Sequence, residues 1–140
     1  MPDRYAIAVA TFYEDLAQKL VAGARAVFED AGAEVDVYEV PGAFELALAA
    51  KLCAQTGRYA GVACLGAVIR GETSHYDYVC SESARGIQNV QLETGVPCGF
   101  GVLTVDNHFQ ALARLGERRH QGADAARAVL ALARIRAELG

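Results

Sequence analysis

The chain has 140 residues, of which 53% are hydrophobic and 21% are charged, and its formal net charge is −4. This length predicts a single domain over residues 1–140 that buries one core, and the composition excludes an intrinsically disordered chain. The acidic balance argues against a nucleic-acid-binding protein, because such proteins normally carry clusters of surplus Lys and Arg.

The N-terminal segment and the cysteines bear on the cell compartment. Only five consecutive apolar residues, 6–10, precede the acidic pair Glu14 and Asp15, which is too few for the core of a signal peptide. No apolar run approaches the length of a membrane span. The four cysteines form no Cys-x-x-Cys pair and are expected to be reduced, buried thiols. We therefore expect a cytoplasmic protein without a membrane segment.

The first half of the chain contains two predicted strand–helix units. Residues 4–11 form a strand, and Thr11 with Glu14 fits a capping box for a helix that Gly32 ends. Residues 33–40 alternate between acidic or small and apolar side chains, which indicates a less covered strand at an edge. A helix is predicted over residues 43–55, with Glu45 in its first turn, where the helix dipole favours a carboxylate.

The second half repeats this order. A buried strand over residues 59–69 precedes a polar loop and a helix over residues 75–95, whose inward side chains are Val79, Cys80, Ser83, Ile87 and Val90. A strand over residues 97–105 contains glycines that permit close approach of a neighbour or a ligand. Asp106 or Asn107 then caps a short helix to Arg114. After a polar break, a last helix turns these side chains to the core: Ala126, Val129, Leu130, Ala133 and Ala137.

Four alternating strands and helices predict an α/β fold. We expect a three-layer α/β/α sandwich with a four-stranded parallel sheet, in which a flavodoxin-like strand order is the simplest. The carboxyl ends of all four strands then share one edge, where such proteins bind ligands. This edge gathers residues 11–12, 41–45, 70–75 and 106–107.

The loop before His75 is the most informative candidate for a site. A loop at the carboxyl end of a parallel strand, facing the positive end of a helix, commonly binds an anion. A neutral His75 at that helix start would suit a proton acceptor, although its position alone favours a solvated side chain by about two to one. His108 and His120 are interpreted as solvated. No pair of His or Cys has metal-ligand spacing.

Three other side chains at this edge have two interpretations each. Phe12 either packs on the core, which we favour by about two to one, or stacks on a flat heterocycle. Glu45 either satisfies the helix dipole or contacts a ligand. Arg114, with Arg118 and Arg119, either lies in solvent or clamps a phosphate if the chain folds back on residues 71–74. The loop matches neither the Walker nor the dinucleotide motif, so ATP and NAD are not implied.

Three segments together carry a resemblance to a known family. They are VPGAFEL at 40–46, GAVIRGETSHYDYV at 66–79 and FGVLTVDNHFQALAR at 100–114. In this order they resemble the 6,7-dimethyl-8-ribityllumazine synthase family of riboflavin biosynthesis, and the resemblance covers nearly the whole chain. The central segment is the most specific of the three.

The resemblance implies a flavodoxin-like fold and a defined reaction. The family condenses 5-amino-6-ribitylaminouracil with 3,4-dihydroxy-2-butanone 4-phosphate, releasing phosphate and water, with neither a metal nor an organic cofactor. It also implies a homopentamer acting on small-molecule substrates, and it leaves open a decamer, a 60-mer shell and a complex with riboflavin synthase.

The resemblance also assigns roles to matched positions. His75 matches the proton-transfer histidine, Arg114 the arginine that holds the phosphate, and Phe12 the aromatic that stacks on the pyrimidine. Ala43, Phe44 and Glu45 match the loop that holds the ribityl chain. Val68 and Ile69 match the strand end beside the uracil. Glu72, Thr73 and Ser74 match the loop whose backbone binds the phosphate. Phe100 matches an aromatic that the adjacent subunit contributes.

Several features depart from the family pattern. Thr11 stands where arginine is frequent, Ala47 replaces a proline, and Gln121 replaces a lysine near the phosphate end, for which Arg118 or Arg119 could compensate. The link from residue 114 to 122 is one residue shorter than in shell-forming relatives, which favours a pentamer. Two other functions stay open: a weakly active paralogue that binds flavin or lumazine, and a flavodoxin-like phosphate- or nucleotide-binding module.

Overall fold

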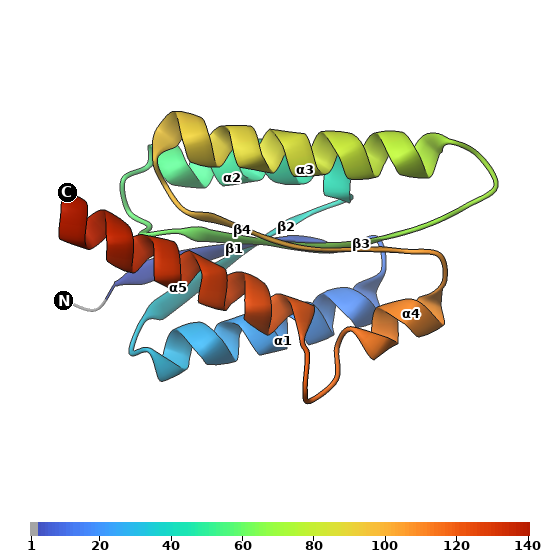
Figure 1. Cartoon of the computed structure of the whole chain (residues 1–140), viewed down its shortest axis with the longest axis horizontal. Helices are drawn as coiled ribbons and strands as arrows, with labels where there is room; N and C mark the ends of the chain where they lie inside the picture. The colour runs from blue at the N-terminus through green and yellow to red at the C-terminus, as the bar shows by residue number, and fades with distance from the viewer. Residues whose placement is uncertain (1–2) are drawn as a thin grey trace.

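The computed structural model describes residues 3–140, which form one four-stranded sheet between two layers of helices (Figure 1). The strands are β1 (Arg4–Ala10), β2 (Glu34–Val40), β3 (Val62–Ile69) and β4 (Cys98–Val105). They pair in parallel in the order β2-β1-β3-β4. The predicted α/β/α class and the flavodoxin-like strand order are therefore confirmed.

Within residues 3–140, five α-helices and one short 3-10 helix lie between or after these strands. They are α1 (Glu14–Asp30), η1 (Ala43–Glu45), α2 (Leu46–Gln55), α3 (His75–Thr94), α4 (His108–Ala113) and α5 (Gln121–Leu139). Figure 1 shows α2 and α3 on one face of the sheet and α1 and α5 on the other. Positive φ angles at Gly32, Gly57 and Gly95 follow the ends of α1, α2 and α3, as the sequence predicted for Gly32.

The core has two parts, one on each face of the sheet. In β1, Tyr5, Ile7 and Val9 join the cluster beneath α1 and α5, while the small residues Ala6 and Ala8 join the cluster beneath α2 and α3. A strand buried on both faces is apolar without interruption, which is the pattern that residues 5–10 show. β2 is less covered and lies at an edge of the sheet, as its alternating sequence predicted.

The glycines of β4 allow a helix to approach closely. A Cβ atom on Gly99 would lie 2.5 Å from the carbonyl oxygen of Ala125, and one on Gly101 would lie 3.0 Å from the Ala125 side chain. Any larger residue would push α5 away from the strand. Of the two explanations for these glycines, the neighbouring helix is therefore the correct one.

Two local predictions were wrong. Thr11 does not cap α1, because its hydroxyl and its backbone N–H both donate to the carbonyl of Val40 and so extend the sheet. The N-cap position is Tyr13, which makes no side-chain capping bond. The helix predicted over residues 43–55 is divided, because Glu45 accepts a hydrogen bond from the backbone of Gly42 at 2.9 Å and closes a separate 3-10 turn.

The last helix also differs in detail from its predicted face. Ala126 and Val129 are buried and Leu130 and Ala133 are partly buried, but Ala137 is exposed in the final turn.

The four cysteines are free. Cys53, Cys64 and Cys98 are buried as expected, whereas Cys80 is only partly buried.

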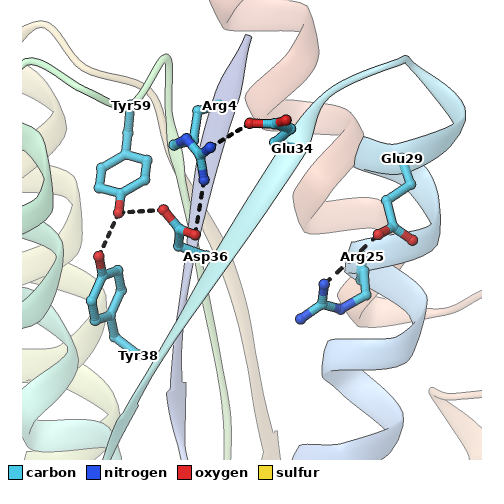
Figure 2. Close-up of polar contacts among 7 residues, drawn as sticks. All are labelled: Arg4, Arg25, Glu29, Glu34, Asp36, Tyr38 and Tyr59. Atoms are coloured by element: carbon cyan, nitrogen blue, oxygen red, sulfur yellow. Dashed lines mark hydrogen bonds and ion pairs between the residues drawn. The ribbon is translucent and has the colours of Figure 1, made fainter. Parts of the chain in front are cut away.

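A polar network fixes the edge strand β2 to its neighbours (Figure 2). The guanidinium of Arg4 contacts Glu34 and lies 2.9 Å from Asp36, and the Tyr59 hydroxyl donates to the other Asp36 oxygen at 2.8 Å. Tyr38 hydrogen-bonds to the same Tyr59 hydroxyl. The hydrogen bond from Tyr59, with the nearby Arg4 charge, lowers the pKa of Asp36. The network lies toward the amino ends of the strands, away from the candidate site.

Candidate active site

A cavity of about 790 Å³ lies at the carboxyl ends of β1 and β3. Its lining comes from four parts of the chain: residues 12–13 after β1, residues 42–45, residues 67–69 with Gly71 and Thr73, and residues 75–76 and 78–79 of α3. In Figure 1 the loops that follow β1 and β3 lie at the same end of the sheet, with η1 beside them. The cavity therefore forms where the strand order predicts a ligand crevice.

Phe12 belongs to the cavity and not to the core. Its side chain is 75% exposed, and its ring makes an edge-to-face contact with Tyr13 at 4.9 Å between centroids. The core interpretation that the sequence favoured was therefore wrong. An exposed aromatic ring in a mainly apolar cavity can stack on a flat ligand, and burying it against one would remove apolar surface from water.

The turn η1 forms the second wall. Ala43 is buried, whereas Phe44 and Glu45 are exposed and line the cavity. One carboxylate oxygen of Glu45 accepts the Gly42 N–H, which leaves the rest of that carboxylate free to accept from ligand hydroxyl groups. The buried Ser83 of α3 donates its hydroxyl to the Ala43 carbonyl at 3.1 Å and so ties this wall to α3.

His75 is the first residue of α3, and its side chain lines the cavity. The loop before it is short and exposed from Gly71 to Ser74, and Thr73 accepts the His75 backbone N–H at 3.3 Å. Thr73 also lines the cavity. Backbone N–H groups at this helix start and a titratable imidazole thus share one space, which suits an anionic substrate that also needs a proton moved.

The strand end beneath this loop supplies an apolar floor. Val68 and Ile69, the last two residues of β3, line the cavity together with Ala67. A heterocycle between this floor and Phe12 would contact apolar surface on both faces. Such a site is mostly apolar, with a few polar groups that fix orientation.

Sequence reasoning did not single out two neighbours of His75. Tyr76 lines the cavity, and burial raises the pKa of its hydroxyl. Arg70 follows β3, and its guanidinium carbon lies 4.3 Å from the centre of the Tyr76 ring. Arg70 also lies 3.0 Å from an oxygen of Asp106, and this hydrogen bond raises the pKa of the guanidinium. The only sequence signal for these two residues was a basic side chain, Arg70, directly after a predicted strand.

Among residues 3–140, four positions matched by the resemblance lie outside the lining of this cavity: Glu72, Ser74, Phe100 and Arg114. Glu72 and Ser74 belong to the same exposed loop as Thr73. Phe100 lies on the edge strand β4 and is 37% exposed. Arg114 borders a different hollow, of about 740 Å³, with Arg118, Arg119 and Gln121. Within one chain, the basic segment does not fold back on residues 71–74.

The other two histidines have structural contacts. His108 lies 2.9 Å from the carboxylate of Asp15 and is exposed, which joins α4 to α1. His120 is partly buried, and its Nδ1 atom accepts the Ala123 N–H at 3.3 Å, so the solvated interpretation was wrong for this residue. Residues 3–140 contain no group of three or more His, Cys, Asp or Glu side chains arranged to hold a metal ion.

Comparison with known proteins identifies the family. Residues 3–137 match the model of a protein family described as 6,7-dimethyl-8-ribityllumazine synthase. The chain belongs to the 6,7-dimethyl-8-ribityllumazine synthase family. No helix within residues 3–140 of this family member has the length and apolar character needed to cross a membrane.

Three relatives named 6,7-dimethyl-8-ribityllumazine synthase illustrate the similarity within the family. The protein of Thermococcus gammatolerans is 47% identical over 131 residues, which cover 93% of this chain and 85% of the relative. The protein of Salinibacter ruber is 44% identical over 140 residues, which cover 97% of this chain and 90% of the relative. The protein of Synechococcus elongatus is 43% identical over 139 residues, which cover 94% of this chain and 77% of the relative. The resemblance seen in three sequence segments therefore extends over nearly the whole chain.

Proposed function

We propose that this chain catalyses the reaction of its family, the condensation of 5-amino-6-ribitylaminouracil with 3,4-dihydroxy-2-butanone 4-phosphate to 6,7-dimethyl-8-ribityllumazine, phosphate and water. One observation carries the proposal: Phe12, Glu45 and His75, from three distant segments, line one cavity at the carboxyl ends of the strands. Family membership and the identity of 43% to 47% with named synthases support the same reaction.

Each wall of the cavity has a role in this proposal. The uracil ring stacks on Phe12 and lies beside Val68 and Ile69, and the ribityl hydroxyls bond to the turn of Ala43, Phe44 and Glu45. The phosphate of the second substrate binds at the backbone of Glu72, Thr73 and Ser74, next to the start of α3. These positions agree with an apolar floor, a carboxylate on one side and an exposed loop on the other.

The chemistry requires protons to move rather than electrons. The substrate amine adds to the ketone and a water leaves to form an imine. Phosphate then leaves, and the second amine closes the ring with loss of another water. His75 accepts and returns protons during these steps. General acid–base help of this kind contributes about 10²- to 10⁴-fold, and holding both substrates together supplies much of the remaining acceleration.

The site requires a second copy of the chain. Phe100 and Arg114 lie on the segment from β4 to the end of α4, and in residues 3–140 neither lines the cavity that contains His75. We assign them to the site of the adjacent subunit, where Phe100 closes the cavity and Arg114 binds the phosphate. A head-to-tail contact of this type generates a ring, and a homopentamer is the assembly we propose.

Light scattering tests the assembly. A pentamer has five times the chain mass of 14.8 kDa. A measured mass close to that of a single chain would contradict both the ring and the shared site.

An absorbance assay tests the activity. Purified protein is mixed with the two substrates, and lumazine formation is followed against a no-enzyme control and an arm without the phosphate substrate. The proposal expects turnover that requires both substrates. Tight binding of riboflavin or lumazine without turnover would instead identify a binding protein and overturn the proposed reaction.

A further inference from the structure

Arg70 connects three parts of the chain at the edge of the cavity. It follows β3, and its backbone N–H donates to the Val105 carbonyl at 2.9 Å. Its side chain lies 3.0 Å from Asp106, beyond β4, and 3.6 Å from Asp77, in the first turn of α3. The guanidinium also lies over the Tyr76 ring at 4.3 Å. Arg70 thus joins the ends of β3 and β4, through its backbone and through Asp106, to the start of α3.

The helix start that Arg70 contacts has little other support. Residues 71–75 are all exposed, and Ser74 at the N-cap makes no side-chain capping bond. The hydroxyl of Thr73, at 3.3 Å from the His75 nitrogen, is a long local contact. Exposed segments with few packed contacts open easily. The contacts from Arg70 to Asp77 and Tyr76 are therefore among the few that tie the first turn of α3 to the sheet, beside the contact of the Tyr76 hydroxyl with Thr104 of β4.

The far end of this connection is well anchored. Asp106 donates its backbone N–H to the Gln110 side chain at 2.7 Å, and Asn107 accepts the Gln110 N–H at 2.9 Å. These bonds fix the start of α4 after β4. Arg70 therefore joins an exposed helix start to a capped and ordered one.

We propose that Arg70 is a positioning residue that holds the first turn of α3, and with it His75 and the loop 71–74, in the geometry required for catalysis. This inference rests on the proposed function. The guanidinium is already paired with two carboxylates and covers an aromatic ring, so it acts through the helix and not as a phosphate ligand.

Arg85 provides a matched control. It lies on the same helix, is exposed, and makes an ion pair with Glu82 at 3.7 Å, but it lies outside the cavity lining among residues 3–140. Arg85→Ala removes one cation and one ion pair from α3 without touching the helix start. Surface pairs of this type contribute little to stability.

The experiment compares Arg70→Ala, Arg70→Lys and Arg85→Ala with the unaltered protein. In Arg70→Ala we expect kcat at saturating substrates to fall about ten-fold, because a displacement of about 1 Å can cost as much as about 10²-fold and the rest of α3 still supports His75. Arg70→Lys should recover only part of this loss, because an ammonium cannot span two carboxylates as a fork. Arg85→Ala should stay within about two-fold of the unaltered protein.

Hydrogen exchange supplies a readout that does not depend on activity. The amides of Asp77 and Tyr78, which donate to the Ser74 carbonyl, should exchange about ten-fold faster in Arg70→Ala than in Arg85→Ala, because the first turn opens more often. An unchanged exchange rate, or faster exchange with an unchanged kcat, would overturn the inference. So would a variant whose only change is a higher KM for the phosphate substrate, since that result identifies a direct phosphate ligand.

The two readouts separate failure of this inference from failure of the proposed function. If the unaltered protein forms no lumazine but exchange at Asp77 and Tyr78 still depends on Arg70, the reaction is wrong and the positioning role stands. If lumazine forms and neither readout responds to Arg70→Ala, the reaction stands and the positioning role is wrong.

Discussion

His75 and Glu45 line the same cavity although they are thirty positions apart in the sequence. The hydrogen bonds of their elements explain how. Glu45 is held by the Gly42 backbone in a 3-10 turn, and that turn is held by the buried hydroxyl of Ser83. His75 begins the same helix that carries Ser83. At the scale of single residues, α3 therefore supports two opposite walls of the site.

The role of His75 is tested by its replacement with alanine. Because proton transfer contributes only part of the acceleration, His75→Ala should lower kcat by about 10²- to 10⁴-fold without abolishing turnover. His108→Ala is the control, since His108 pairs with Asp15 and lies outside the cavity lining in residues 3–140. Steady-state lumazine absorbance measures both variants. An unchanged kcat in His75→Ala would refute the assignment.

Ser83→Ala tests the support of η1. Without the hydroxyl, the Ala43 carbonyl keeps the Leu46 N–H as a donor but loses its second donor, and the loss of one such hydrogen bond costs about 0.5–1.5 kcal/mol of unfolding free energy. We also expect a higher KM for the ribityl substrate, because the turn of residues 43–45 loosens. Urea unfolding and steady-state kinetics measure the two effects. The exposed Ser81→Ala is the control, and equal behaviour of the two variants would contradict this role.

At the scale of elements, α5 is positioned by its first residues. The ring of His120 packs where a Cβ on Gly23 of α1 would come within 2.3 Å, so only glycine leaves room for it. Gly122 likewise lies against the backbone of Leu20. His120 also caps α5 by accepting the Ala123 N–H. The imidazole of His120 therefore has two roles: it packs against α1 at Gly23, and it caps the start of α5.

This contact predicts a pH-dependent stability. Burial lowers the pKa of His120 in the folded state below the ordinary value of 6.5. The unfolded chain then binds the proton more readily, so the contribution of His120 is complete above pH 6.5 and is lost as the pH falls below it. His120→Asn keeps an N-cap acceptor without titrating. Its thermal midpoint should fall less than that of the unaltered protein between about pH 7 and pH 5, and an equal fall would contradict the prediction.

The elements show which features a sequence can predict. Apolar runs and glycine stops located all four strands within about three residues, because burial and backbone conformation are local properties. The capping of α1 was missed because Thr11 has a distant partner, the Val40 carbonyl. The break at η1 was missed although it is local, because Glu45 was interpreted through the helix dipole and not through its bond to the Gly42 N–H. Phe12 was misassigned because periodicity cannot distinguish a ring on the core from a ring beside it.

At the scale of the whole molecule, the proposed site is incomplete within one chain, because Phe100 and Arg114 lie outside its cavity in residues 3–140. The family motifs named Phe100 and Arg114 from the sequence, but no local pattern could tell that Arg114 borders a separate hollow. Phe100 is 37% exposed on an edge strand that has no further strand beside it in residues 3–140. A ring of copies would cover this edge and bring both side chains to a neighbouring cavity.

Mixed assemblies test this claim most directly. Differently tagged His75→Ala and Arg114→Ala chains are co-expressed, and heteromers carrying both tags are assayed for lumazine at a low concentration of the phosphate substrate, where each variant alone is impaired. If each site takes His75 from one chain and Arg114 from its neighbour, random mixing restores about one quarter of the sites in a ring. Lumazine formation near a quarter of the unaltered rate is the expected result. A rate no higher than the average of the two separate variants would contradict the shared site.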